Sequence, residues 1–187
     1  MLIARLLLVL ALVPACAPDD SPEPVDYWLP LQCGTRAEVA QGNFSDFSHN
    51  GLASYAFDIV IDLDTPVVAM AAGEVVYVRD ENRPGDPCHE GGDMSCFDLA
   101  NLVVLRHGDA TLTLYKHLNQ ALVTPGAAVE RGDVLGLSGS TGWSTRPHLH
   151  VMRMEDCGAD YCQSIDLEFV EAGVPSMGDF VTAAPCP

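Results

Sequence analysis

The chain has 187 residues, of which 48% are hydrophobic and 19% are charged. This length suits one domain with a single core, and the composition excludes a chain that is disordered throughout. The formal net charge is −17. Because nucleic-acid phosphates and anionic lipid surfaces repel such a chain, we expect no nucleic-acid partner.

The N-terminal part differs from the rest of the chain. Arg5 precedes a short apolar run, residues 6–13, which is too short to cross a bilayer and is typical of a secretory signal. We expect a signal peptide over 1–15, followed by Cys16 in a context that resembles the lipobox of bacterial lipoproteins. Residues 16–30 are rich in proline and acid and predict an extended tether behind the lipidated cysteine.

These features predict an exported protein of the cell envelope. Lipidation of Cys16 would anchor it to the membrane, facing the periplasm or the cell wall. The alternative is cleavage without lipidation, which would release a soluble secreted protein.

Seven cysteines in an exported chain leave one without a partner. If Cys16 carries the lipid, an even set of six is left for disulfides in an oxidising compartment. Short separations favour two pairs, and the remaining two cysteines would then join the ends of the domain. The pairs expected in this way are Cys88–Cys96, Cys157–Cys162 and Cys33–Cys186. Metal binding by these thiols is the competing use, but their spacing forms no Cys-x-x-Cys pairs.

The domain expected over residues 31–187 carries mostly strand signals. The apolar runs that read as strands are 56–63, 73–78, 101–106, 111–117, 134–137 and 148–151. Residues 107–110 give a hairpin turn between two of them. No segment keeps a helical period, so we expect an all-β, mainly antiparallel fold, in the form of a small sheet or barrel-like sandwich stapled by disulfides.

Two histidines stand close together in the last of these runs. His148 and His150 are separated by one residue, so a strand places both side chains on the same face. Adjacent imidazoles suit a metal site or an acid/base pair. For His-x-His alone, a polar strand face with two hydrogen-bonded histidines is the simpler interpretation.

Three further residues complete a possible metal site. His49 lies in a polar loop, His117 ends a strand, and Asp58 lies in an apolar stretch where a buried carboxylate needs a cation or several donors. Singly, they could be a loop histidine, a strand-end surface group and a turn cap. Jointly with the histidine pair they supply two His and one Asp as ligands and two His for proton transfer, the inventory of a catalytic zinc site.

A series of motifs in the same order supports this interpretation. They are Ser48–Gly51, Tyr55–Asp58, Thr65–Ala69, Gly73–Val76, Asn101–Val104, Leu114–Leu118, Gly132–Gly136, Ser138–Gly142 and Ser144–His150. Over residues 42–154 the chain thereby resembles the lysostaphin-type zinc endopeptidases, which cut peptide bridges in bacterial cell walls.

The resemblance implies the roles of individual residues. Zinc would be bound by His49, Asp58 and His150, and the catalytic work would be done by His117 and His148. It also implies a small antiparallel β domain with a narrow groove over the metal, acting on the peptide stems and cross-bridges of peptidoglycan. We expect a monomer. Eight residues separate the first two ligands, more than in the shortest members of the family.

The division of labour between the two catalytic histidines stays open. We assign activation of the water to His148, while His117 would orient the water or hydrogen-bond the oxyanion; the reverse is also consistent with the sequence. Tyr115 shares a strand face with His117, so it either lines the groove or packs in the core. We expect structural hydrogen bonds for His107 and a solvated loop position for His89.

Two other functions compete with hydrolysis. The same fold could serve as a non-hydrolytic module that binds peptidoglycan or activates another hydrolase, which predicts a lost or occluded metal. A purely structural zinc domain would favour a closed shell of four ligands, usually with cysteine.

Overall fold

A computed structural model describes residues 24–184. The strands in this range are β1 (Arg36–Gln41), β2 (Phe57–Val60), β3 (Pro66–Val68), β4 (Gly73–Arg79), β5 (Asn101–Arg106), β6 (Leu112–Ala121), β7 (Ala128–Val129), β8 (Val134–Ser138), β9 (Leu149–Met154), β10 (Ser164–Ile165) and β11 (Phe180–Thr182). Two short 3₁₀ helices, η1 (Gly51–Ala53) and η2 (Met94–Leu99), lie in the loops. None of the helices in the described range is long and apolar enough to span a membrane.

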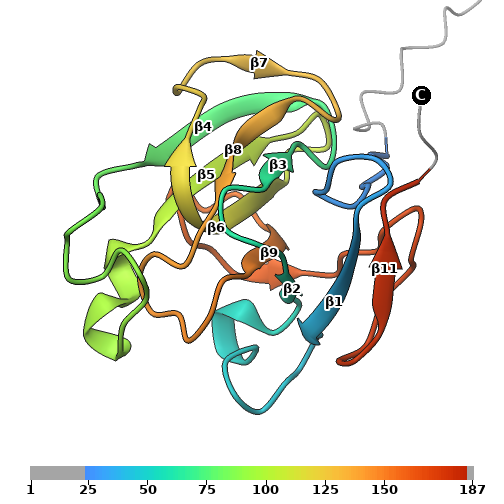
Figure 1. The fold of residues 1–187 in the computed structure, drawn as a ribbon. Coiled ribbons are helices and arrows are strands. Elements are labelled where there is room, and N and C mark those ends of the chain that lie inside the picture. Colours follow the sequence, from blue (N-terminus) through green and yellow to red (C-terminus); the bar gives the residue numbers. More distant parts are fainter. Residues whose placement is uncertain (1–23, 185–187) are drawn as a thin grey trace, which may run out of the picture.

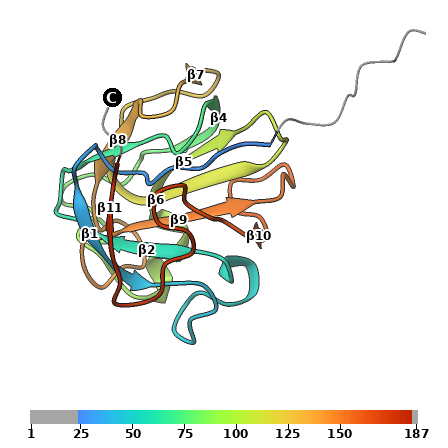
Figure 2. The same ribbon diagram turned by 90° about the vertical axis from the view of Figure 1, so that its right-hand side faces the viewer.

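The strands form one antiparallel sheet. Its main path runs β11-β1-β2-β9-β6-β5-β4-β7, while β8 pairs with β6 and β3, and β10 pairs with β9. Figures 1 and 2 show β2, β9 and β6 side by side in the middle of the molecule. The expected all-β, antiparallel fold is confirmed. The sheet is open, because its two outermost strands, β11 and β7, do not pair with each other.

Both faces of the central strands are buried. On β5, Val103 and Leu105 belong to the larger apolar cluster, whereas Leu102 and Val104 belong to a second cluster on the opposite face. Strands covered on both faces read as continuous apolar runs rather than as a polar and apolar alternation. The packing on both sides gives the site residues on β6 and β9 a rigid support.

The segment before β1 corrects one expectation. We expected an extended tether as far as residue 30, but Tyr27 and Leu29 are buried in the larger cluster. The Tyr27 hydroxyl lies 2.8 Å from Thr111 Oγ1. Burying each apolar side chain contributes about 1.5–3 kcal/mol, which outweighs the preference of the neighbouring prolines and acids for an extended, solvated chain. The predicted signal peptide and Cys16 lie outside the described residues.

Two of the three expected disulfides are present in the described range. They are Cys88–Cys96 and Cys157–Cys162, as their short separations predicted. Cys33 is also disulfide-bonded, and its expected partner, Cys186, lies outside the described residues.

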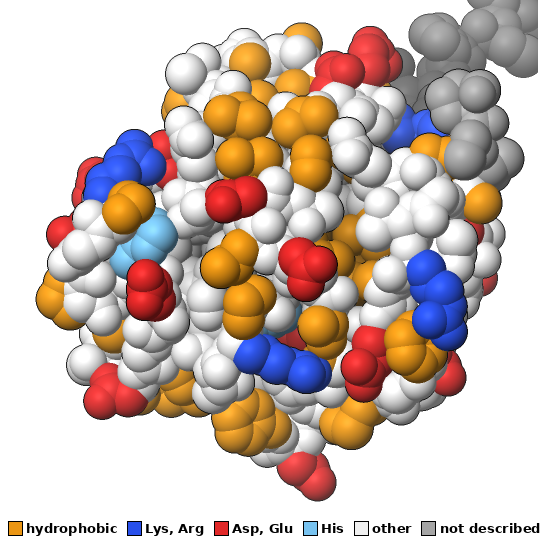
Figure 3. Space-filling model, in the orientation of Figure 1, with side chains coloured by type: hydrophobic (Ala, Val, Ile, Leu, Met, Phe, Trp, Pro, Cys, Tyr) orange, Lys and Arg blue, Asp and Glu red, His pale blue; other side chains and the backbone are white. Residues whose placement is uncertain are grey.

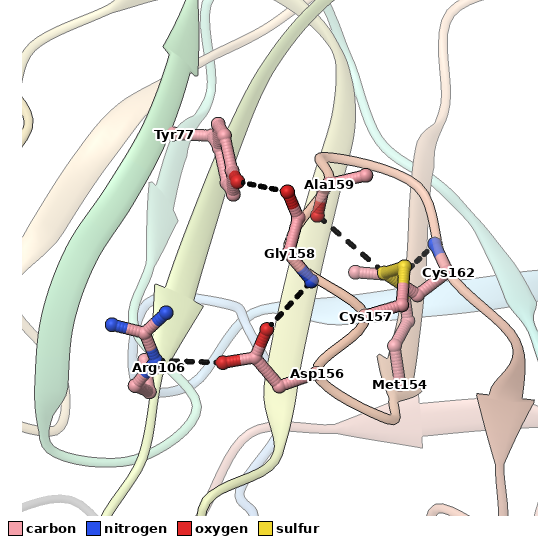
Figure 4. Close-up of a disulfide and its surroundings, with 8 residues drawn as sticks. All are labelled: Tyr77, Arg106, Met154, Asp156, Cys157, Gly158, Ala159 and Cys162. Atoms are coloured by element: carbon pink, nitrogen blue, oxygen red, sulfur yellow. Dashed lines mark hydrogen bonds and ion pairs between the residues drawn. A yellow bond between two sulfur atoms is a disulfide. The ribbon is translucent and has the colours of Figure 1, made fainter.

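The loop closed by Cys157–Cys162 is fastened to the sheet at several points (Figure 4). Arg106 Nε on β5 donates to Asp156 Oδ2 at 2.8 Å, and the Tyr77 hydroxyl on β4 donates to the carbonyl of Gly158 at 2.6 Å. These contacts hold a loop that carries no regular structure of its own. Its position matters because the same loop supplies Tyr161 to the groove described below.

Candidate metal centre

Three neighbouring strands place a row of polar residues on one face of the sheet. Asp58 on β2 is the cross-strand partner of His150 on β9, and His150 is in turn the partner of Lys116 on β6. Directly opposed residues of antiparallel strands point to the same side, so the three side chains lie next to one another. His49 reaches the row from the loop that precedes η1.

The structure brings together the three residues that the sequence proposed as ligands. Asp58 Oδ1 lies 3.1 Å from His49 Nε2 and 2.9 Å from His150 Nδ1. One ligand atom from each residue lies within 4.8 Å of the others, and all three residues are buried. These atoms could hold a single metal ion.

The hydrogen bonds of His49 decide which of its nitrogens faces the carboxylate with a lone pair. Nδ1 lies 2.9 Å from the carbonyl oxygen of Gly42, which can only accept, so Nδ1 carries the proton. In the neutral ring, Nε2 then directs a lone pair at Asp58 Oδ1. Two lone pairs at this distance repel, so the arrangement calls for a proton or a metal cation between them. Donation of the second ring N–H to a backbone carbonyl is also the usual arrangement of a metal-binding histidine.

The other two histidines stand together beside this group. The rings of His117 and His148 are 4.6 Å apart, and His148 Nε2 lies 3.7 Å from Asp58 Oδ1. Each ring donates Nδ1–H to a backbone carbonyl, at 2.7 Å to Thr141 and at 2.8 Å to Arg146. Both Nε2 atoms are therefore acceptors when the rings are neutral.

The backbone at His117 departs from regular strand geometry. Its φ is +72°, in the left-handed region that side chains other than glycine rarely adopt. Here β6 changes partner: it pairs with β9 up to Lys116 and with β8 from Leu118 onward. The left-handed residue breaks the alternation of faces, so Lys116 and His117 both line the same groove. Tyr115 is fully buried instead, and its hydroxyl accepts from Met70 N, so it packs in the core.

Burial and neighbouring charges shift the pKa values in opposite directions. Burial alone would raise the pKa of Asp58, but its contacts with the rings of His150 and His49 outweigh it and hold that pKa well below its usual range. Burial lowers the pKa of His150 to about 4, although Asp58 opposes the change. Burial, followed by repulsion from His148, holds the pKa of His117 well below the usual histidine value. His117 is therefore neutral at physiological pH.

The histidines and Asp58 open onto a groove of about 290 Å³. Figure 3 shows a hollow in the lower half of this face, with red and pale-blue atoms inside it between hydrophobic side chains. The residues that line the groove are Ala40, Gln41, Phe47, Ser48, Asp58, Phe97, Lys116, His117, Trp143, Ser144, Thr145, Arg146, His148, His150, Tyr161 and Met177. His49 is fully buried behind it. The groove therefore exposes a floor of ionisable groups between aromatic walls.

Comparison with known proteins identifies the family. Residues 53–160 match peptidase family M23. The chain belongs to this family. The matched range contains Asp58, His117, His148 and His150, while His49 lies just before it.

Two curated proteins and one solved structure illustrate the M23 relationship. The peptidoglycan DD-endopeptidase ShyA of Vibrio cholerae is 37% identical over 102 residues, which are 54% of this chain and 19% of that protein. Lysostaphin of Staphylococcus staphylolyticus is 30% identical over 137 residues, 73% of this chain and 26% of that protein. The structure of lysostaphin from Staphylococcus simulans matches with a TM-score of 0.52 and 29% identity, over 70% of this chain and 47% of that chain. The chain thus spans about a quarter or less of the length of these two curated relatives.

Sequence reasoning did not place Lys116 in the groove of this M23 domain. Lys116 is only 5% exposed, and burial lowers its pKa to about 8. Regular alternation would have placed it opposite His117, on the other face of the strand. One signal was available, because Lys116 is the only lysine in the sequence.

Two other histidines lie outside the groove. His107 makes structural hydrogen bonds, as expected, with Nδ1 at 2.8 Å from the carbonyl of Ala72 and Nε2 at 2.7 Å from Thr113 Oγ1. His89 was expected to be solvated, but both of its ring nitrogens are buried. Its loop folds back on the domain, because Gly92 forms a β-bridge with Ser144.

Proposed function

We propose that this chain is a zinc-dependent endopeptidase that hydrolyses the peptide cross-links of bacterial cell-wall peptidoglycan. The observation that carries the proposal is the convergence of His49, Asp58 and His150 on one point, beside a second pair of histidines and below an open groove. Family membership supports the peptidase activity.

The donor atoms suit zinc held by His49, Asp58 and His150. Two imidazoles and one carboxylate are the three protein ligands typical of a catalytic zinc site, whereas a structural site takes four, often with cysteine. The cysteines at 88, 96, 157 and 162 are used in disulfides. When bound, zinc supplies Lewis acidity: it polarises a carbonyl and shifts the pKa of water towards about 7.

The hydrogen bonds of the other two histidines favour one division of labour. His148 holds its proton on Nδ1, so Nε2 takes a proton from the attacking water and later returns it to the leaving amine. His117 is neutral and also protonated on Nδ1, so its Nε2 accepts a hydrogen bond from the water and orients it. Its neutral ring has no second N–H to donate to an oxyanion.

Peptidoglycan as the substrate is supported by the relatives. ShyA is a peptidoglycan DD-endopeptidase by name, and lysostaphin is described as an antimicrobial peptidase. The groove is open to solvent and is lined by the histidines and by aromatic side chains, which suits an extended peptide.

Metal content and hydrolysis of wall material together test this function. We expect the purified full chain to hold one zinc ion and to release new amino groups from purified peptidoglycan. Mass spectrometry should locate the cut in the cross-links. A chelator should abolish hydrolysis, and added zinc should restore it. A chain that binds peptidoglycan with or without zinc but never cuts it would overturn the proposal in favour of a non-hydrolytic module.

The location of the enzyme is a separate proposal. Cleavage of the signal 1–15 and lipidation of Cys16 would keep the domain at the membrane, in the envelope and within reach of the wall. We expect the chain expressed with its native signal to enter the detergent phase on partitioning, and Cys16→Ser to stay in the aqueous phase. Equal aqueous recovery of both would show a secreted soluble protein instead.

A further inference from the structure

Lys116 occupies an unusual place for a lysine. Its ammonium nitrogen lies 4.1 Å from the centroid of the Phe97 ring and 5.2 Å from that of Tyr161. The side chain is almost fully buried, yet it lines the groove beside Asp58 and His150. Contact with the two rings stabilises the cation, and no group of residues 24–184 accepts a hydrogen bond from its N–H donors.

The two rings are held in place by covalent links. Phe97 follows Cys96 of one disulfide, and Tyr161 precedes Cys162 of the other. The two rings also contact each other, with centroids 5.8 Å apart. Two loops far apart in the sequence are therefore each closed by a disulfide next to the aromatic residue that touches the lysine.

Arg79 on β4 joins these two loops. Its Nη1 donates to the carbonyl of Asp98 at 2.9 Å, and its Nη2 pairs with Asp160. The neighbouring residues of the two rings are thus connected through one guanidinium. Such support holds the lysine in a single position, so little side-chain entropy is lost when a ligand meets it.

The charged side chains that line the groove favour an anion. Within residues 24–184, the ammonium of Lys116 makes neither a hydrogen bond nor an ion pair. Among the described residues that line the groove, Asp58 is the only carboxylate, whereas Lys116 and Arg146 are both cations. Asp58 Oδ1 already meets the rings of His49 and His150. Asp98 and Asp160 also act on the ammonium from the two loops, but neither lines the groove, and Asp160 is paired with Arg79. Among the charged side chains that line the groove, the cations therefore outnumber the single carboxylate, in a chain whose formal charge is −17.

We propose that Lys116 is a specificity-determining residue that binds a free carboxylate of the substrate peptide close to the scissile bond. Zinc in the adjacent site would add further positive charge, which strengthens the demand for an anion. The proposal rests on the peptidase function above and narrows its substrate class: cross-links flanked by a carboxylate are favoured over uncharged bridges such as chains of glycine. An ammonium–carboxylate contact in a partly desolvated groove is a charge-assisted hydrogen bond.

A pair of matched substrates tests this proposal. One is a purified cross-linked peptide dimer with a free carboxylate on the residue that flanks the scissile bond. The other is the same dimer with that carboxylate converted to a primary amide. The enzymes are the disulfide-bonded full chain, Lys116→Met, which keeps the length of the side chain without the charge, and Arg131→Met. Arg131 is the matched control, because it also stacks on a ring, that of Trp28, away from the groove.

We expect the unmodified chain to cleave the carboxylate dimer with a kcat/KM at least about 10-fold higher than the amide dimer. Lys116→Met should lose this preference through a higher KM for the carboxylate dimer, with zinc content unchanged, and Arg131→Met should keep it. Equal cleavage of both dimers by the unmodified chain would overturn the carboxylate assignment even if Lys116→Met fails to fold. Cleavage of neither dimer would instead count against the proposed peptidase function.

Discussion

Two buried histidine environments lie along β6, and they differ in how their nitrogens are satisfied. Near the start of the strand, the two nitrogens of His107 each have a neutral partner, the Ala72 carbonyl and the Thr113 hydroxyl. Near the other end, the rings of His49, His148 and His150 all approach one oxygen, Asp58 Oδ1, at 3.1, 3.7 and 2.9 Å.

The difference shows what separates a structural histidine from a binding site. Nε2 of neutral His49 and of neutral His148 carries a lone pair and not a proton, so the carboxylate oxygen, which only accepts, cannot satisfy these two nitrogens. Nε2 of His150 is in addition buried and has no hydrogen-bond partner within the described residues. Both ring nitrogens of His107 have hydrogen-bond partners, so this residue needs no ligand. The second cluster instead brings nitrogen lone pairs close to one negative charge, and a bound cation would stabilise both.

Removing the shared carboxylate should have the largest effect. We expect Asp58→Ala to weaken zinc binding by at least about 100-fold and to abolish hydrolysis, because the loss of a residue that only supports a ligand already costs about 10–100-fold. Zinc content after dialysis measures this effect. Asp62→Ala, at an exposed carboxylate nearby in sequence, is the control and should keep both properties. Full zinc loading of Asp58→Ala would show that the ligand set is wrong.

Removal of one acid/base group should act on catalysis alone. We expect His148→Ala to retain zinc and to lose about 100- to 10,000-fold in kcat, because general acid/base catalysis typically contributes that much. Single-turnover hydrolysis and metal analysis of the same sample check both parts. Activity within a few-fold of the unmodified chain would transfer the role of the base to His117.

Removal of the hydrogen-bond partner of His107 should lower the stability of the fold without affecting zinc binding or activity. Thr113→Val removes the hydroxyl beside His107 Nε2 while keeping the shape of the side chain. We expect the free energy of unfolding to fall by about 1–3 kcal/mol, the cost of an unsatisfied buried polar group, with zinc content and activity unchanged. Urea unfolding measures the loss, and Thr182→Val at an exposed position of β11 serves as the control. Loss of zinc from Thr113→Val would contradict the assignment of His107 as a structural histidine that is separate from the metal site.

The smallest expected effect is a pH dependence that belongs to His107. Burial lowers its pKa in the folded chain, so the unfolded chain binds the proton more readily. The stability that His107 contributes is complete above about pH 6.5, the unfolded value, and is lost as the pH falls through that value towards the folded one. We expect His107→Gln to flatten the fall in unfolding free energy below pH 6.5 by at most about 1.4 kcal/mol per pH unit. Urea unfolding curves at several pH values test this, and parallel pH profiles would contradict it.

Much of the fold could be predicted because local signals agreed with the tertiary structure. The run 101–106 became β5 with the same bounds, and the expected strand 73–78 ends one residue short of β4. The tether prediction failed at Tyr27 and Leu29, because composition does not reveal which apolar side chains find a core to enter. Burial of both faces of β5 could not be predicted either, because an apolar run does not indicate which elements cover the strand.

The sequence proposed the members of the candidate site, and the structure supplied their geometry. His49, Asp58, His117, His148 and His150 were recognised from residue type and motif order, and all five lie together. For Tyr115 the sequence left the groove and the core both open, and the structure places it in the core; for Lys116 the sequence gave no prediction. The left-handed backbone conformation of His117 breaks the alternation of faces, so Lys116 lines the groove. No sequence pattern predicts a positive φ at a histidine.

The sequence by itself determined the chemical inventory of this protein: the family motifs, the number of nitrogen and carboxylate donors, the two short disulfides and a single lysine. Tertiary structure alone decided which lone pairs meet and which rings surround the lysine. The physical reason is that these contacts join loops and strands far apart in the chain, and short-range preferences carry no information about them. Orientation at a site depends on backbone dihedrals and on hydrogen bonds to carbonyls, and both are set only when the sheet has formed.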